Sequence, residues 1–140
     1  MLPRTLLRLP GLRPLLAFVT ARRVVVRGRS MEPALLPGER VLFDRLAYRD
    51  APPRTGDVVL ARHTERPGLR IVKRVAGVPG DTVELDGGSR RLGDGEWLLL
   101  GDAPEASTDG RDFGPVGREA ILARGWLVYW PPGRVRKLHP

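Results

Sequence analysis

Apolar residues along this chain come in short runs, and Pro-Gly or Gly-Asp steps separate several of these runs. Runs of four to eight residues bounded by turn residues are typical of β-strands. The pattern predicts seven strands, at Arg23–Arg27, Arg40–Leu46, Asp57–Arg62, Leu69–Ala76, Thr82–Asp86, Glu96–Leu100 and Trp126–Trp130. A hairpin turn is expected at Asp86-Gly87-Gly88.

Helical periodicity is confined to residues 12–22 and to a short turn near Arg118–Leu122. The chain is therefore expected to be all-β, a coiled barrel or sandwich of short strands cornered by proline and glycine, with a short N-terminal helical or irregular leader. We expect a leader at 1–22, one domain at 23–132 and a flexible tail at 133–140. Two long loops, 47–56 and 101–118, are where a site is most expected, because long loops on a β scaffold commonly carry function.

One predicted strand contains an unusual charge. A period of two over Leu69–Val75 places Leu69, Ile71, Lys73 and Val75 on the inward face and turns Arg70 and Arg74 outward to water. Of 24 basic residues only two are lysines, and a buried lysine, unlike arginine, can lose its proton. Lys73 is thus either a general base or a strand residue whose ammonium reaches the edge of the sheet.

The amino-acid composition excludes thiol chemistry and argues against a metal site. There is no cysteine, which excludes disulfides and thiol catalysis, and only two unclustered histidines, so neither a metal site nor a cofactor is expected. The net charge of +8 raises the possibility of a basic barrel that binds nucleic acid. The scattered arginines and the 6% aromatic content show no nucleic-acid-binding signature, so no nucleic-acid partner is expected.

The N-terminal segment is apolar but interrupted. Arginines and prolines break residues 1–21, and the longest clean run is far shorter than the roughly 20 residues that span a bilayer. No signal-peptide cleavage pattern follows. The prediction is a cytoplasmic protein whose residues 1–21 can lie on the inner face of a membrane as a peripheral amphipathic element.

A base needs a group to activate, and Ser30 is the candidate. It lies at a strand-to-turn junction, after Gly28, which permits close backbone approach, and before Pro33, which stiffens the chain. A neutral lysine can activate a serine hydroxyl, although a serine before Met-Glu-Pro is also an ordinary turn residue. His63 is a second possible base, but its Arg-His-Thr-Glu setting predicts a solvent-facing strand end.

Three stretches together resemble the signal peptidase I family. They are Ser30-Met31-x-Pro33, then Lys73-Arg74-Val75-x-Gly77-x-Pro79-Gly80-Asp81, then Gly101-Asp102 with Ser107-x-Asp109-x-Arg111 and Gly114-Pro115-Val116. The resemblance implies a LexA/signal-peptidase-like β fold and a serine endopeptidase that uses a Ser-Lys dyad.

The resemblance implies a role for the residues of each of these three stretches, which are called sequence boxes below. Ser30 is the nucleophile, Lys73 the general base and Ser107 the residue that orients the lysine, and the Ser30 backbone N–H donates to the oxyanion. Asp102, Asp109 and Arg111 support the loop. Met31, Pro33 and Ile71 are expected to line the substrate cleft.

The sequence departs from the family pattern in ways that bear on the oxyanion hole and on the branch of the family that it resembles. Gly28 stands where the family often has a hydroxyl that completes the oxyanion hole, so a second donor is unassigned. The short chain and the run from Ala106 to Val116 look most like the branch that matures nickel-type superoxide dismutase, whose implied substrate is the propeptide of that precursor. The alternatives are a general signal peptidase acting at the membrane, a LexA-like self-cleaving regulator and the nucleic-acid-binding barrel. No DNA-binding domain precedes the boxes, which argues against the LexA-like regulator.

Overall fold

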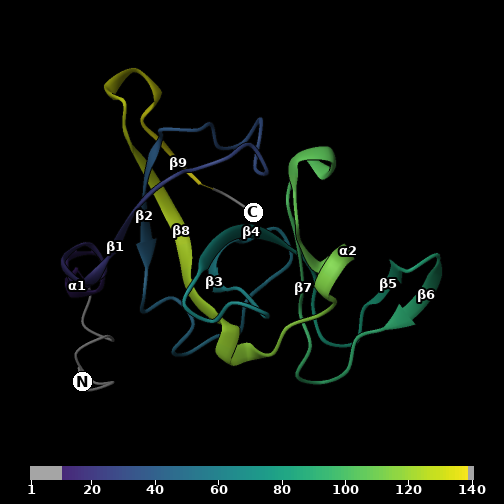
Figure 1. The fold of residues 1–140 in the computed structure, drawn as a ribbon. Helices are drawn as coiled ribbons and strands as arrows, with labels where there is room; N and C mark the ends of the chain where they lie inside the picture. The colour runs from purple at the N-terminus through teal and green to yellow at the C-terminus, as the bar shows by residue number, and fades with distance from the viewer. Residues whose placement is uncertain (1–10, 139–140) are drawn as a thin grey trace.

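The computed structural model describes residues 11–138, which form an antiparallel β structure with few helices (Figure 1). The strands are β1 (Arg22–Val25), β2 (Arg40–Asp44), β3 (Val58–Arg62), β4 (Arg70–Gly77), β5 (Thr82–Leu85), β6 (Gly88–Arg91), β7 (Leu98–Leu100), β8 (Ile121–Trp130) and β9 (Arg136–Lys137). The helices are α1 (Leu12–Thr20) and α2 (Gly110–Phe113), with 3-10 turns η2 (Pro104–Ala106), η3 (Arg118–Ala120) and η4 (Pro132–Arg134). The all-β prediction is confirmed.

One curved sheet carries almost all of the strands. Its order is β1-β2-β8-β3-β4-β7, with β9 paired to the side of β8, and every pairing is antiparallel. The β5–β6 hairpin forms a separate ribbon that projects from the rest in Figure 1. Because β1 and β7 end the strand order, the sheet leaves open edges at both ends.

Both faces of the sheet are covered, and β3 shows this most clearly. Val58 and Leu60 pack into one buried cluster with Phe43, whereas Val59 and Ala61 pack into a second cluster on the opposite face. A strand with two covered faces reads as a continuous apolar run, as Val58–Ala61 does. The central strand β3 is therefore a rigid partner for its neighbour β4.

Several element boundaries differ from the predicted ones. Strand β8 begins at Ile121, so the predicted helical turn at Arg118–Leu122 is only the 3-10 turn η3, and its last residues belong to the sheet. Strand β6 was not predicted, because its Gly-Ser-Arg-Arg sequence has no apolar alternation and all four residues are exposed. Helix α2 lies within the predicted 101–118 loop.

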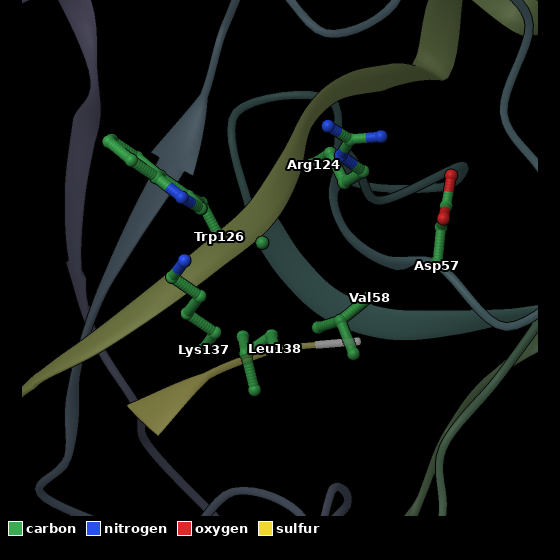
Figure 2. A pocket seen from close by; sticks show the side chains of 7 residues that line it. Asp57, Val58, Arg124, Trp126, Lys137 and Leu138 are labelled. Atoms are coloured by element: carbon green, nitrogen blue, oxygen red, sulfur yellow. The ribbon is translucent and has the colours of Figure 1, made fainter. Parts of the chain in front are cut away.

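The C-terminal segment is ordered up to Leu138, and the expectation of a flexible tail at 133–140 is wrong over that range. Strand β9 pairs with β8, and the Leu138 N–H donates to the Trp126 carbonyl over 2.9 Å. Figure 2 shows Leu138 and Val58 on facing sides of the groove beside β8. Strand β9 was not predicted because its Arg-Lys sequence contains no apolar residue, although its partner β8 is the preceding strand in the chain. Residues 139 and 140 lie outside the described residues.

The predicted leader is described from residue 11 onward. Helix α1 packs against β2, where Ala17 is buried and the Arg13 guanidinium lies 3.3 Å from the Asp44 carboxylate. Among residues 11–138, no helix is both long and apolar enough to cross a membrane. Residues 1–10 of the predicted leader lie outside the described residues.

Candidate active site

Lys73 lies in the middle of β4 and points into the protein. Its side chain is only 4% exposed and shares a face with Ile71 and Val75, as the period of two predicted. Its Nζ donates a hydrogen bond to Ser107 Oγ over 2.9 Å. Leu69 was expected on the same apolar face but is 46% exposed, because it lies in the loop that joins β3 to β4, just before β4 begins.

The surroundings of Lys73 favour its neutral form. Burial lowers the pKa of Lys73 below its ordinary value, because an ammonium loses its hydration in this apolar setting. The positive charge of Arg111 acts in the same direction, while the carboxylates of Asp109 and Asp112 partly oppose the shift. The net direction is the one that a general base requires.

Ser107 links Lys73 to a fully buried carboxylate. Ser107 Oγ donates to Asp109 Oδ2 over 2.7 Å, so its lone pairs remain to accept from Lys73. Asp109 has no solvent exposure and also accepts from the Gly101 N–H over 2.8 Å and from the backbone and guanidinium of Arg111. Burial alone raises the pKa of Asp109, but these hydrogen bonds, Arg111 first, bring it below its usual value.

Helix α2 begins on this same carboxylate. Asp109 caps the helix by accepting from the Arg111 N–H, and Asp112 Oδ2 accepts in return from the Asp109 N–H over 2.9 Å. This reciprocal pair is a capping box with aspartate in the position usually taken by glutamate. The loop that carries Ser107 is therefore held by hydrogen bonds on both sides of the serine.

Asp102 holds the same loop against β4. It forms a two-pronged pair with Arg74, with both N–O distances at 2.9 Å, and Arg74 also donates to the Gly56 carbonyl over 2.8 Å. Arg74 was expected to point out to water, but it is half-buried in this pair. The structural role of Arg74 was missed because its partner lies 28 residues away.

Ser30 enters the site from the loop between β1 and β2. Its carbonyl accepts from the Ala103 N–H over 2.9 Å, so the Ser30 and Ser107 loops are in direct contact. Gly101 makes this approach possible, because a Cβ there would lie 2.7 Å from the Ser30 carbonyl oxygen and 2.7 Å from Ser107 Cβ. The three sequence boxes thus meet at one place.

Ser30 and Lys73 line the same cleft, which has a volume of about 600 Å³, and both also line a second cleft of about 430 Å³ beside it. Met31 and Ile71 line the larger cleft. Pro33 is exposed and is not among the residues that line either cleft. Gly28 lines both clefts, with a φ of 72° that favours glycine.

The walls of the larger cleft are two open strand edges. Strand β1 pairs only with β2. Residues 70–73 of β4 pair with β3, whereas β7 pairs with β4 from Arg74 onward. Backbone groups of both strands therefore remain available to an extended peptide that enters between them.

The other candidate base, His63, lines the smaller cleft together with Ser30 and Lys73, whereas the second lysine lies elsewhere. His63 Nδ1 accepts from the backbone N–H groups of Glu65 and Arg66 at 3.1 and 3.2 Å, so this nitrogen is already used. Lys137 is exposed and lines a separate pocket of about 270 Å³ beside Trp126, with no serine or threonine among its lining residues (Figure 2). Within residues 11–138, no cluster of three or more metal-binding side chains is present.

Comparison with known proteins gives consistent matches. The family model described as "Signal peptidase, peptidase S26" matches residues 6–92, a range that contains both Ser30 and Lys73. The chain is 34% identical over 123 residues to mitochondrial inner membrane protease subunit 2 of Danio rerio, covering 82% of this chain and 67% of the relative. It is 30% identical over 153 residues to signal peptidase I of Leptolyngbya laminosa, covering 88% and 75%.

A first prediction concerns the contact between the two serine loops. Gly101→Ala should lower kcat/KM on the order of 100-fold, because the added methyl group forces Ser30 and Ser107 apart. Gly95→Ala is the matched control, since nothing lies within 4 Å of a Cβ at that position. Peptide-cleavage kinetics on folded protein measure the effect, and equal activity of the two variants would contradict the packing argument.

A second prediction concerns the buried ammonium. Because the pKa of Lys73 is lowered in the folded state, the unfolded chain binds more protons between that lowered pKa and 10.5. The stability of the wild-type protein therefore rises with pH through this window. Lys73→Met should be more stable than wild type below the window, and its advantage should shrink as the pH approaches 10.5.

Urea unfolding at a series of pH values measures this difference. Lys137→Met is the control, because Lys137 is exposed and its replacement should give no such pH-dependent gain. A Lys73→Met variant with no stability advantage at any pH would show that burial of the ammonium is not costly.

Proposed function

The chain belongs to the signal peptidase, peptidase S26, family, and on that premise we propose that Ser30 is the nucleophile and Lys73 the general base of a serine endopeptidase. The observation that carries the proposal is the buried Lys73 Nζ, held by Ser107 in a cleft that Ser30 also lines. Family membership favours this reading over the nucleic-acid-binding barrel.

The reaction follows from these positions. Neutral Lys73 takes the hydroxyl proton of Ser30 as Oγ attacks the scissile carbonyl, and then returns it to the departing amine. The same lysine activates the water that hydrolyses the acyl-enzyme. Ser107 keeps Nζ directed because its own proton is committed to Asp109, so it can only accept from the lysine.

The oxyanion is stabilised by backbone donors. The Ser30 N–H has no acceptor among the residues that the structure describes, and it is therefore available to the developing negative charge. Gly28 brings no hydroxyl, so the second donor is not a side chain at that position. We expect the positive-φ turn at Gly28 to leave room for the substrate carbonyl.

The substrate is an extended segment of a precursor protein. It would lie between β1 and residues 70–73 of β4 and pair with both edges, while Met31 and Ile71 contact its side chains. We propose that the precursor is nickel superoxide dismutase and that the cut removes its N-terminal propeptide. The Ala106–Val116 run supports this substrate, and a general signal peptidase that cleaves secretory signal peptides is the second candidate.

The test is cleavage of a nickel superoxide dismutase precursor by the purified chain, with mass spectrometry to locate the cut. Ser30→Ala and Lys73→Arg should each abolish cleavage while the protein stays folded, because arginine cannot act as the base. Ser107→Ala should lower kcat by about 10- to 100-fold, less than the roughly 10²- to 10⁴-fold that a proton-transfer group itself contributes, because Ser107 only orients the lysine amine. Ser89→Ala, an exposed serine on β6, should cleave at the wild-type rate.

Two outcomes would redirect the proposal. Full activity of Lys73→Arg would remove the base assignment. Cleavage of a secretory preprotein at its signal-peptide boundary, with the dismutase precursor left intact, would replace the maturation function by the general signal peptidase.

The protein is further proposed to act in the cytoplasm, in peripheral contact with the inner face of a membrane. The relative from Danio rerio is named for an inner membrane. In this chain, residues 1–31 contain seven arginines and no acidic residue. Helix α1 exposes Leu15, Phe18 and Val19, and Arg22 and Arg23 follow with no partner among the described residues. Exposed apolar groups beside free arginines suit an anionic lipid surface.

Vesicle sedimentation tests this contact. The protein should bind vesicles that contain an anionic lipid and not vesicles of zwitterionic lipid alone, and Leu15→Glu/Phe18→Glu should lose most of the binding. Val135→Glu is the control, because Val135 is equally exposed but lies at the other end of the chain. Undiminished binding of the α1 variant would place the membrane contact elsewhere.

A further inference from the structure

The loop that carries Ser30 contains short-range hydrogen bonds, such as Leu35 N to the Met31 carbonyl over 2.9 Å, but no helix or strand. It leaves β1 and returns to β2, and two backbone hydrogen bonds close its base, from Val26 N to the Glu39 carbonyl over 2.8 Å and from Gly38 N to the Val26 carbonyl over 2.9 Å. Met31 and Leu35 anchor it to the core. The position of Ser30 therefore depends on these anchors and also on what holds the segment between Leu35 and the base of the loop.

A side chain from strand β9 holds that segment. Arg136 Nη2 donates to the Ala34 carbonyl over 2.6 Å and to Glu39 Oε2 over 2.8 Å, while its Nη1 donates to Glu39 Oε1 over 3.1 Å. Glu39 is fully buried, and its Oε2 also accepts from the Leu36 N–H over 3.1 Å. One guanidinium thus fixes the loop at Ala34 directly and at Leu36 through the carboxylate.

The charge state of this pair suits a permanent contact. Burial by itself raises the pKa of Glu39, but the hydrogen bonds from Arg136 and the Leu36 N–H and the charges of Arg136 and Arg134 bring it below its usual value. Glu39 therefore stays ionised at neutral pH. A buried carboxylate in a two-pronged pair with arginine is geometrically well defined, and loss of either partner leaves an uncompensated group.

Ser30 is held from two directions. On the cleft side, its carbonyl accepts from Ala103, in the loop that also carries Ser107. On the other side, Arg136 holds Ala34, four residues after the serine. Lys73 belongs to the rigid sheet and its amine is fixed by Ser107, so the distance from Ser30 Oγ to Lys73 Nζ is set by the loop.

From these contacts we propose that Arg136 is a positioning residue, which fixes the nucleophile loop so that Ser30 Oγ meets the lysine amine. It touches neither substrate nor reacting atoms. The inference rests on the proposed function only in taking Ser30 as the nucleophile. Small displacements of a reacting group can cost about 100-fold in rate, so the role should appear in kcat.

The experiment compares Arg136→Gln and Arg136→Lys with Arg134→Gln. Arg134 approaches the same carboxylate, with Nε 3.4 Å from Glu39 Oε1, but none of its described side-chain contacts reaches the loop backbone. Each protein is assayed at a temperature at which circular dichroism shows it folded. The measurements are kcat and KM for precursor cleavage, the rate of Ser30 acylation by an activated ester, and the pH midpoint of kcat.

Arg136→Gln should lower kcat and the acylation rate by about 10- to 100-fold, with KM within about threefold of wild type. The pH midpoint should stay in place, because Ser107 and Asp109 still surround Lys73. Arg136→Lys, which keeps the charge but loses the two-pronged geometry, should lie between Gln and wild type, and Arg134→Gln should keep wild-type kcat.

Several results would overturn the inference. A lowered melting temperature with wild-type kcat in Arg136→Gln would show a purely structural role, and the same holds for Arg136→Lys if the glutamine variant does not fold. A moved pH midpoint would place the effect on Lys73 instead. If the wild-type protein cleaves nothing and Ser30 resists acylation, the proposed function fails. If Ser30→Ala is inactive and Arg136→Gln is not, only the positioning role fails.

Discussion

The carboxylate of Asp109 is sealed from solvent, and the arrangement of the site depends on it. It receives hydrogen bonds from Ser107, Gly101 and Arg111, which lie on different parts of one loop, and thereby fixes the shape of that loop. Because the Ser107 proton is committed to Asp109, the serine can only accept from Lys73. The orientation of the lysine amine is therefore set by Asp109 through Ser107, over two successive hydrogen bonds.

The burial of the Lys73 side chain next to this carboxylate is itself unfavourable. An ammonium at 4% exposure among apolar side chains costs stability, and the loop does not offset it with a direct carboxylate partner. A carboxylate bonded directly to Nζ would favour the charged ammonium. Placing a hydroxyl between Lys73 and Asp109 keeps the amine directed and still allows it to be neutral. Catalytic sites commonly retain such costly groups.

The sequence predicts those features of the fold and the site that depend on residues close together in the chain. The inward direction of Lys73 follows from the pleat of a strand, which fixes alternate residues on opposite faces whatever the rest of the chain does. The meeting of Ser30 with Ser107 was predicted only through resemblance to a family. Residue patterns alone could not show that Gly101 is the point of contact between their loops.

What escaped prediction depends on partners far away in the chain. Arg74 was expected to face solvent because the residues around it in β4 do not indicate its ion pair with Asp102, which lies 28 residues later. Strand β9 was not predicted, since its Arg-Lys sequence has no apolar residue and Arg136 pairs with Glu39, which is 97 residues upstream, while the β9 backbone pairs with β8. Leu69 was misplaced for a different reason, because alternation assigns a face but does not say where the covering layer ends.

The link between Arg136 and Glu39 also has a consequence for the order of events during synthesis. The ribosome delivers Ser30 and Lys73 first, and the guanidinium that holds the serine loop follows Glu39 by 97 residues. At about 5 to 20 residues per second, that interval lasts roughly 5 to 20 seconds. A nascent chain therefore contains Ser30, Glu39 and Lys73 before it contains the guanidinium that pairs with Glu39 and binds the Ala34 carbonyl.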